Sequence, residues 1–157
     1  MPLRLPMVRH LKSPDLFDAI DRVPALGTPI GRSTFEVSNP STGEVLAELP
    51  DMGVGETRAA IDKAYVAQAE WAALTARERS EMLWRWHQLI VDHTDDLAAI
   101  LTAEMGKPLA EAKSEVSHAA AYLQWYAEEA NRIYGETISA PSTDRRMLVI
   151  KQPIGVV

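Results

Sequence analysis

A periodic stretch between residues 55 and 135, interrupted by glycine and proline, constrains the fold of this chain more than any other feature. Apolar residues recur there at three- and four-residue steps, which is the spacing of amphipathic helices. A capping box at residues 75–78 marks one helix start, and Gly106 with Pro108 marks a stop and a restart. The pattern predicts three long helices, over about 55–72, from Thr75 to about Met105, and from Pro108 to Gly135.

Shorter segments with the period of β-strands flank these helices. Residues 34–37 and 44–49 enclose a dense turn signal at 39–43, which predicts a hairpin. The apolar run 147–150 predicts a strand, and Pro153 separates it from a second apolar segment, 154–157. A strand of that kind needs a sheet to join, so we expect the rest of the sheet to lie outside this chain.

Composition narrows the class of protein. The 157 residues are 46% hydrophobic and 24% charged, which is typical of one soluble domain, and the formal net charge is −6. Repulsion from phosphates then disfavours nucleic acid and anionic membranes as partners. No apolar run approaches the roughly 18 to 20 residues of a membrane-spanning helix, so we expect no membrane association.

The first 32 residues are rich in proline and read as an arm. The first 12 carry Arg4, Arg9 and Lys12 with no acidic residue, which would suit a targeting presequence. Pro2 and Pro6 oppose a helix there, however, and no apolar core or cleavage site follows. We therefore expect a loosely held arm, with a short helix possible near residues 15–21, and a cytoplasmic location.

The sequence assembles no active site. Cysteine is absent, which excludes thiolate nucleophiles, disulfides and thiolate metal sites within the chain. The segment 53–55 (Gly-Val-Gly) is the nearest approach to a phosphate loop but lacks a third glycine, a lysine and a preceding parallel strand. Helical spacing favours core packing for Trp86, and interface or tunnel packing for Trp125. The histidines show no metal-ligand spacing; they are His10, His87, His93 and His118.

Five segments occur in an order that resembles a known family. They are residues 39–44 (Asn-Pro-Ser-Thr-Gly-Glu), 104–112 (Glu-Met-Gly-Lys-Pro-Leu-Ala-Glu-Ala), 125–129 (Trp-Tyr-Ala-Glu-Glu), 133–138 (Ile-Tyr-Gly-Glu-Thr-Ile) and 151–157 (Lys-Gln-Pro-Ile-Gly-Val-Val). The series resembles the amino-terminal third of the aldehyde dehydrogenase superfamily. Residues 56–62 and 145–156 are most similar to bacterial succinate-semialdehyde dehydrogenases.

The resemblance implies an α/β fold, the amino-terminal part of the aldehyde dehydrogenase fold. Its parts would be an arm at 1–32, a hairpin and helices of the nucleotide-binding domain at 33–143, and a truncated strand at 144–157 leading into the oligomerisation and nucleotide-binding sheets. The complete enzyme would use NADP or NAD to oxidise succinate semialdehyde to succinate and would form a homo-oligomer, a dimer or tetramer. Its thiolate nucleophile and general base lie outside this chain, which we expect to be inactive and to bind no nucleotide alone.

The resemblance also suggests site residues. Ser114, His118 and Tyr122, four apart on one helix face, match positions that line the aldehyde tunnel in relatives; plain packing against a neighbouring domain explains them equally well. No catalytic or metal-binding residue is assigned. Two alternatives stay open: a noncatalytic interaction module that docks through its unpaired strand and apolar helix faces, or a dehydrogenase for another small aldehyde.

Overall fold

The computed structural model describes Lys12 and residues 33–157. Most of the arm predicted for residues 1–32, including the possible helix at 15–21, lies outside the described residues. Within the described part, a β-hairpin is followed by four helices, a short 3₁₀ turn and a second hairpin.

The first hairpin confirms the prediction for residues 34–49. Strands β1 (Thr34–Ser38) and β2 (Val45–Pro50) pair antiparallel, with a register shift between Val37 and Ser38. The turn is closed by backbone bonds from Asn39 N to Glu44 O (2.8 Å) and from Gly43 N to Asn39 O (2.8 Å). Gly43 has φ +73°, a left-handed conformation that glycine adopts at little cost.

Four helices replace the three that the periodicity predicts. They are α2 (Val54–Ala73), α3 (Ala76–Asp92), α4 (Thr94–Met105) and α5 (Leu109–Glu129), which ends in the 3₁₀ turn η3 (Ala130–Arg132). The expected capping box is present, since Glu78 N donates to Thr75 Oγ1 (3.3 Å) and Thr75 N donates to Glu78 Oε2 (2.8 Å). The first predicted helix is confirmed. The third ends earlier than predicted.

The second predicted helix is wrong as a single element, because the chain bends at His93. That residue closes α3 and opens α4, with φ −102° and ψ 16°. Thr94 Oγ1 donates back to the carbonyls of Ile90 (3.2 Å) and Val91 (2.8 Å), a pattern that bends helices. Asp95 and Asp96 then fall in the first turn of α4, where acidic residues stabilise a new helix start.

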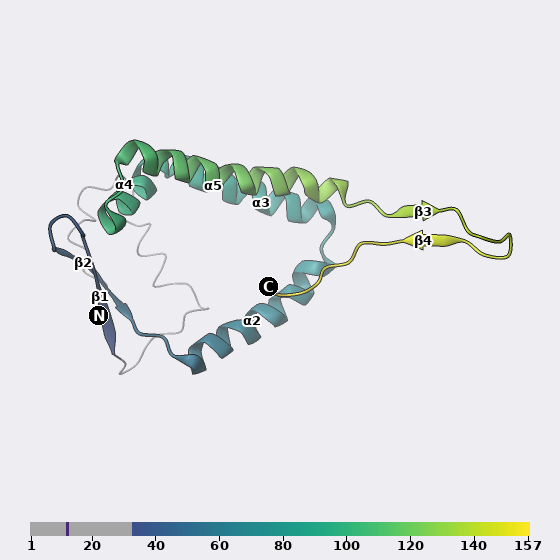
Figure 1. The fold of residues 1–157 in the computed structure, drawn as a ribbon, viewed down its shortest axis with the longest axis horizontal. Helices are drawn as coiled ribbons and strands as arrows, with labels where there is room; N and C mark the ends of the chain where they lie inside the picture. Colours follow the sequence, from purple (N-terminus) through teal and green to yellow (C-terminus); the bar gives the residue numbers. More distant parts are fainter. Residues whose placement is uncertain (1–11, 13–32) are drawn as a thin grey trace.

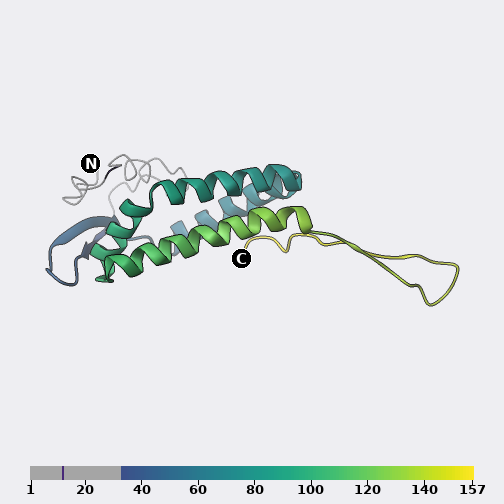
Figure 2. The same ribbon diagram turned by 90° about the horizontal axis from the view of Figure 1, so that it is seen from above.

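Helices α3 and α5 run side by side (Figures 1 and 2). Two α3 side chains bond to α5 carbonyls: Ser80 Oγ donates to Ala127 O (2.6 Å), and His87 Nδ1 lies 2.9 Å from Ala120 O. These contacts are one heptad apart on each helix, so they fix an antiparallel register. A small core of Ala98, Ala112 and Val116 lies beside Ile90, Leu97 and Leu101, where α3, α4 and α5 meet.

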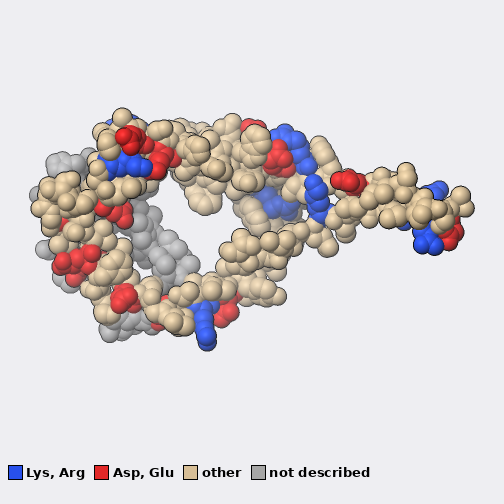
Figure 3. All heavy atoms as spheres, viewed as in Figure 1, with Lys and Arg blue, Asp and Glu red and all other residues tan. Residues whose placement is uncertain are grey.

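Much of the apolar surface is uncovered in the described part of the chain. Helix α2 has no buried residue, and it stands apart from α3 and α5 in Figure 1, while Figure 3 shows the molecule hollowed between them. Trp86, predicted to be core, is 58% exposed, so that prediction is wrong for this chain. Met82 and Leu89, one turn before and after Trp86 on α3, are also exposed, so no described element covers this apolar stripe.

The second hairpin projects from the end of the helices (Figures 1 and 2). Strand β4 (Met147–Val149) confirms the strand predicted near 147–150, and it pairs antiparallel with β3 (Glu136–Ile138), a partner that the sequence pattern did not predict. The segment 154–157 is not a strand, and Ile154 is 90% exposed. A strand exists only through its pairing, and no described residue pairs with this segment.

Candidate functional site

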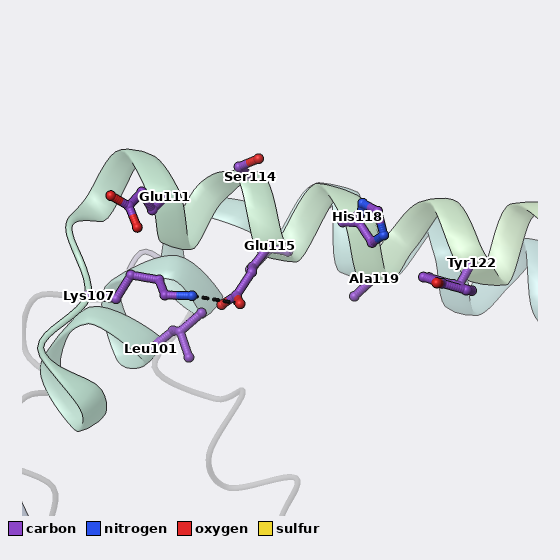
Figure 4. Close-up of a pocket in the computed structure, with 9 residues that line it drawn as sticks. Leu101, Lys107, Glu111, Ser114, Glu115, His118, Ala119 and Tyr122 are labelled. Carbon is purple, nitrogen blue, oxygen red and sulfur yellow. Dashed lines mark ion pairs between the residues drawn. The ribbon is translucent and has the colours of Figure 1, made fainter.

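A hollow of the described structure lies along α5, near its junction with α4. It has a volume of about 720 Å³ and is lined mainly by α5. Figure 4 shows Leu101, Lys107 and Glu115 gathered where α4 meets α5, with Tyr122 farther along the helix. The remaining lining residues are Glu111, Ser114, Val116, His118 and Ala119. The hollow is therefore the surface of one helix, open to solvent along its length.

Helix α5 has one buried face and one exposed face. Its buried residues recur at four- and seven-residue steps and face α3 and α4; they are Ala112, Val116, Ala120 and Ala127. Ser114, His118 and Tyr122 are exposed, and at 100° per residue they lie on the opposite side of the helix. Three of these four buried residues are alanine, whose small side chains let α3 approach closely.

Rings occupy part of this outer face. The His118 and Tyr122 ring centroids are 5.3 Å apart with planes at 61°, an edge-on contact that limits the rotamers of both rings. Trp125 continues the same face one turn on, and is 60% exposed. The face offers apolar ring surface with one hydroxyl and one imidazole, which suits recognition of a small molecule by shape and polarity.

An ion pair closes the end of the hollow near α4. Lys107 Nζ lies 2.6 Å from Glu115 Oε1, and the Lys107 side chain is only 20% exposed. The reversal at Gly106, which has φ +77°, directs Lys107 back along α5. This pairing neutralises the one lysine that lines the hollow, and Glu111 leaves the lining with a net negative formal charge.

The described residues offer neither a metal-binding cluster nor a thiolate nucleophile. They include no group of three or more His, Asp or Glu side chains placed to hold a metal ion, and the whole sequence lacks cysteine. The described helices also include none long and apolar enough to cross a membrane. The outer face of α5 can therefore contribute contacts to a reaction but supplies no nucleophile of the thiolate class.

A dinucleotide does not fit the described residues. Both described sheets are two-stranded and antiparallel, so they lack the parallel strand ends at which such cofactors bind. The glycine segment before α2 is also closed, because Gly53 N donates to Glu56 Oε2 (2.8 Å). A carboxylate already occupies the helix start that a phosphate would need.

The structure brings the three predicted site residues, Ser114, His118 and Tyr122, to one hollow. Sequence reasoning missed Lys107 and Glu115. Their separation is not a helical ion-pair spacing, since Lys107 precedes the helix, and only the geometry of the reversal places them together. A lysine directly before a helix-starting proline was the available signal.

Comparison with known proteins gives one family. The model of the aldehyde dehydrogenase family matches residues 28–157. A probable succinate-semialdehyde dehydrogenase [NADP(+)] from Sinorhizobium fredii is 68% identical over all 157 residues, which are 32% of its length. A glutarate-semialdehyde dehydrogenase from Pseudomonas putida is 55% identical over 123 residues, 78% of this chain and 26% of the relative.

Comparison with solved structures finds a relative of the same kind. A crystal structure of succinate-semialdehyde dehydrogenase from Burkholderia pseudomallei superposes with a TM-score of 0.76 at 50% identity, covering 78% of this chain and 26% of that one. The chain thus spans about a third or less of the length of the relatives it matches.

Proposed function

Because the chain belongs to the aldehyde dehydrogenase family and has the fold of its amino-terminal part, we propose that it is the helical part of an enzyme that oxidises succinate semialdehyde to succinate. The observation that carries the proposal is the 68% identity with the Sinorhizobium fredii relative, which extends over every residue of the chain. The nucleophile and the general base belong to polypeptide outside this sequence.

Uncovered apolar surface supports this role. No large side chain is fully buried in the described structure, whereas Trp86, Leu89 and Ile61 are each more than half exposed. A monomer with this much exposed apolar surface is prone to association. The rest of an aldehyde dehydrogenase fold would cover α2 and the outer side of α3, and the exposed second hairpin suits a subunit contact in a homo-oligomer.

NADP is the proposed cofactor of the complete enzyme, with NAD as the alternative. The name of the Sinorhizobium fredii relative specifies NADP(+), which supports this choice. The closed start of α2 leaves the described residues without a phosphate site, so the nucleotide would be held elsewhere. We expect the complete enzyme to work in the cytoplasm.

In the proposed enzyme, Ser114, His118 and Tyr122 line the path of the aldehyde. They would act on its shape and polarity and would touch no reacting bond. A glutarate semialdehyde differs from a succinate semialdehyde by one methylene, which a pocket wall distinguishes only modestly. The relative from Pseudomonas putida makes the longer semialdehyde the second candidate substrate.

The experiment is to purify the native gene product, determine its mass, and follow NADPH or NADH formation with each semialdehyde. We expect a product longer than this chain that oxidises succinate semialdehyde faster than glutarate semialdehyde, and faster with NADP than with NAD. The 157-residue chain alone should match a protein-free control. A longer product that oxidises neither semialdehyde, or turnover by the chain alone, would contradict the proposal.

The alternative of a noncatalytic module has its own signature. Its exposed helix faces and the unpaired edges of β3 and β4 would hold it to a longer enzyme subunit. In that case the native product would have a mass of 17.4 kDa and would co-purify with a separate, active dehydrogenase. A single long polypeptide that carries both this sequence and the activity excludes the alternative.

A further inference from the structure

One ion pair holds a carboxylate at the wall of the hollow on α5. Lys107 Nζ lies 2.6 Å from Glu115 Oε1, and Figure 4 shows the pair where α4 meets α5. Glu115 is on the same side of α5 as His118 and Tyr122, because three and seven residues separate them along the helix. The side chain of Glu115 is 54% exposed, so its charge acts on whatever enters the hollow.

The fold places Lys107 as a fixed counter-charge. Gly106, with φ +77°, reverses the chain directly before Lys107. The Lys107 side chain is only 20% exposed, so its aliphatic stem is covered while its ammonium reaches Glu115. A lysine held in this way gives up less conformational freedom on pairing than a fully exposed one does.

The balance of charge in the lining depends on this lysine. Glu111, one turn before Glu115, is the other carboxylate among the described residues that line the hollow. With Lys107 in place, one of the two carboxylates is uncompensated; without Lys107, both would be. Like charges repel over several ångströms. Lys107 therefore controls how strongly this wall repels an anion.

We propose that Lys107 is a specificity-determining residue, which admits aldehydes that carry a carboxylate by neutralising Glu115. The inference rests on the proposed function, in which the substrate passes along this face of α5. Succinate semialdehyde and glutarate semialdehyde are both anions at neutral pH, so the inference holds for either substrate. Lys107 acts on the binding of the anion and touches no reacting atom, so its effect falls on KM more than on kcat.

Comparing an anionic with a neutral aldehyde in the complete enzyme measures the shielding. Butanal has the carbon chain of succinate semialdehyde without its charge. Lys107→Met keeps an aliphatic stem and removes the ammonium. The ratio of kcat/KM for succinate semialdehyde to kcat/KM for butanal should therefore fall by roughly two- to fivefold at low salt, through KM. Added salt should shrink this difference, because it screens exposed charges.

Removing the carboxylate should have the opposite sign. Glu115→Gln leaves the Lys107 ammonium without its partner, so the ratio should rise by a similar factor, roughly two- to fivefold. The double variant Lys107→Met/Glu115→Gln restores the formal charge of the lining and should return the ratio close to the parent value. Lys113→Met is the matched control. It removes a lysine of the same helix that pairs with Asp95 (2.7 Å) and does not line the hollow, so the ratio should not change.

Each result decides for or against the shielding. An unchanged ratio in Lys107→Met, in an enzyme that oxidises both aldehydes, would reject the role of Lys107 and leave the proposed function standing. A double variant as impaired as Lys107→Met would show that Lys107 only supports the fold of the reversal. An equal fall in Lys113→Met would show an effect of total charge.

Glu115→Gln decides alone if Lys107→Met does not fold, which far-UV circular dichroism checks. Damage to the fold would not raise the preference for an anion, so a ratio at or below the parent value in Glu115→Gln would reject the inference. A parent enzyme that oxidises neither semialdehyde would reject the proposed function, and this inference would fall with it.

Discussion

Pro40 rests against Gly106: a Cβ added to Gly106 would lie 3.2 Å from Pro40 Cγ. The turn between β1 and β2 therefore packs directly on the end of α4. Gly106 closes that helix with φ +77°, and its N–H donates to Thr102 O (2.9 Å). Two of the segments that carry the family resemblance, 39–44 and 104–112, thus meet in space.

This contact predicts a cost for Gly106→Ala. A methyl group would combine left-handed backbone strain with a tight approach to a stiff proline ring. We expect the free energy of unfolding to fall by about 2 kcal/mol, given a range of roughly 1–3 kcal/mol for such strain. Urea unfolding followed by tryptophan fluorescence measures the change.

Gly43→Ala is the matched control for Gly106→Ala. Gly43 has nearly the same φ, +73°, but nothing lies within 4 Å of its added Cβ. It therefore reports backbone strain without the Pro40 contact. If both variants lose equal stability, the packing of the turn on α4 contributes nothing.

Ser80→Ala should loosen the register of α3 on α5. The buried hydroxyl donates to Ala127 O at 2.6 Å, and its loss outweighs the better helix propensity of alanine. We expect a decrease of about 0.5–1 kcal/mol in the free energy of unfolding, a drop of a few degrees in Tm. Ser117→Ala removes an exposed hydroxyl that bonds within α5 and should leave Tm unchanged. Equal effects in the two variants would argue against the inter-helix bond.

The ion pairs of Asp95 with Lys12 and Lys113 should be lost in acid. The hydrogen bond from Lys113, followed by that from Lys12, lowers the pKa of Asp95 from 3.8 to about 2. A lowered pKa stabilises the folded form above pH 3.8, and that contribution disappears as the pH falls through about 2. A carboxyl carbon NMR titration should give a pKa near 2, raised more by Lys113→Gln than by Lys12→Gln. A parent value of 3.8 would contradict both ion pairs.

Local signals explain what the sequence could predict. The hairpin around Gly43, the capping box at Thr75 and the stop at Gly106 all depend on neighbouring residues, and all three are present. The family resemblance selected Ser114, His118 and Tyr122, and helical spacing placed the three on one face. The family was recognisable because its motifs are also local in sequence.

Features that depend on distant residues escaped prediction. The bend at His93 lies inside an uninterrupted apolar pattern, and it arises from polar competition at Thr94 and the acids after it. Periodicity placed Trp86 in a core. Whether an apolar stripe is buried depends on what covers it, however, and the described residues leave Trp86 uncovered. Ion pairs such as Lys107–Glu115 and Lys12–Asp95 require chain reversals that no residue spacing reports.

The role proposed for His118 predicts a change in substrate preference. Since its ring contacts Tyr122 edge-on and touches no reacting group, His118→Ala in the active enzyme should raise KM while leaving kcat nearly constant. We expect the kcat/KM ratio of succinate semialdehyde to glutarate semialdehyde to change roughly three- to tenfold. Steady-state kinetics with both aldehydes measures this ratio.

His118→Phe keeps a ring but loses the polar nitrogens, so it separates shape from polarity. Ser117→Ala, one residue away and outside the hollow, is the control, and a preference that shifts equally in that variant would remove His118 from the path of the aldehyde.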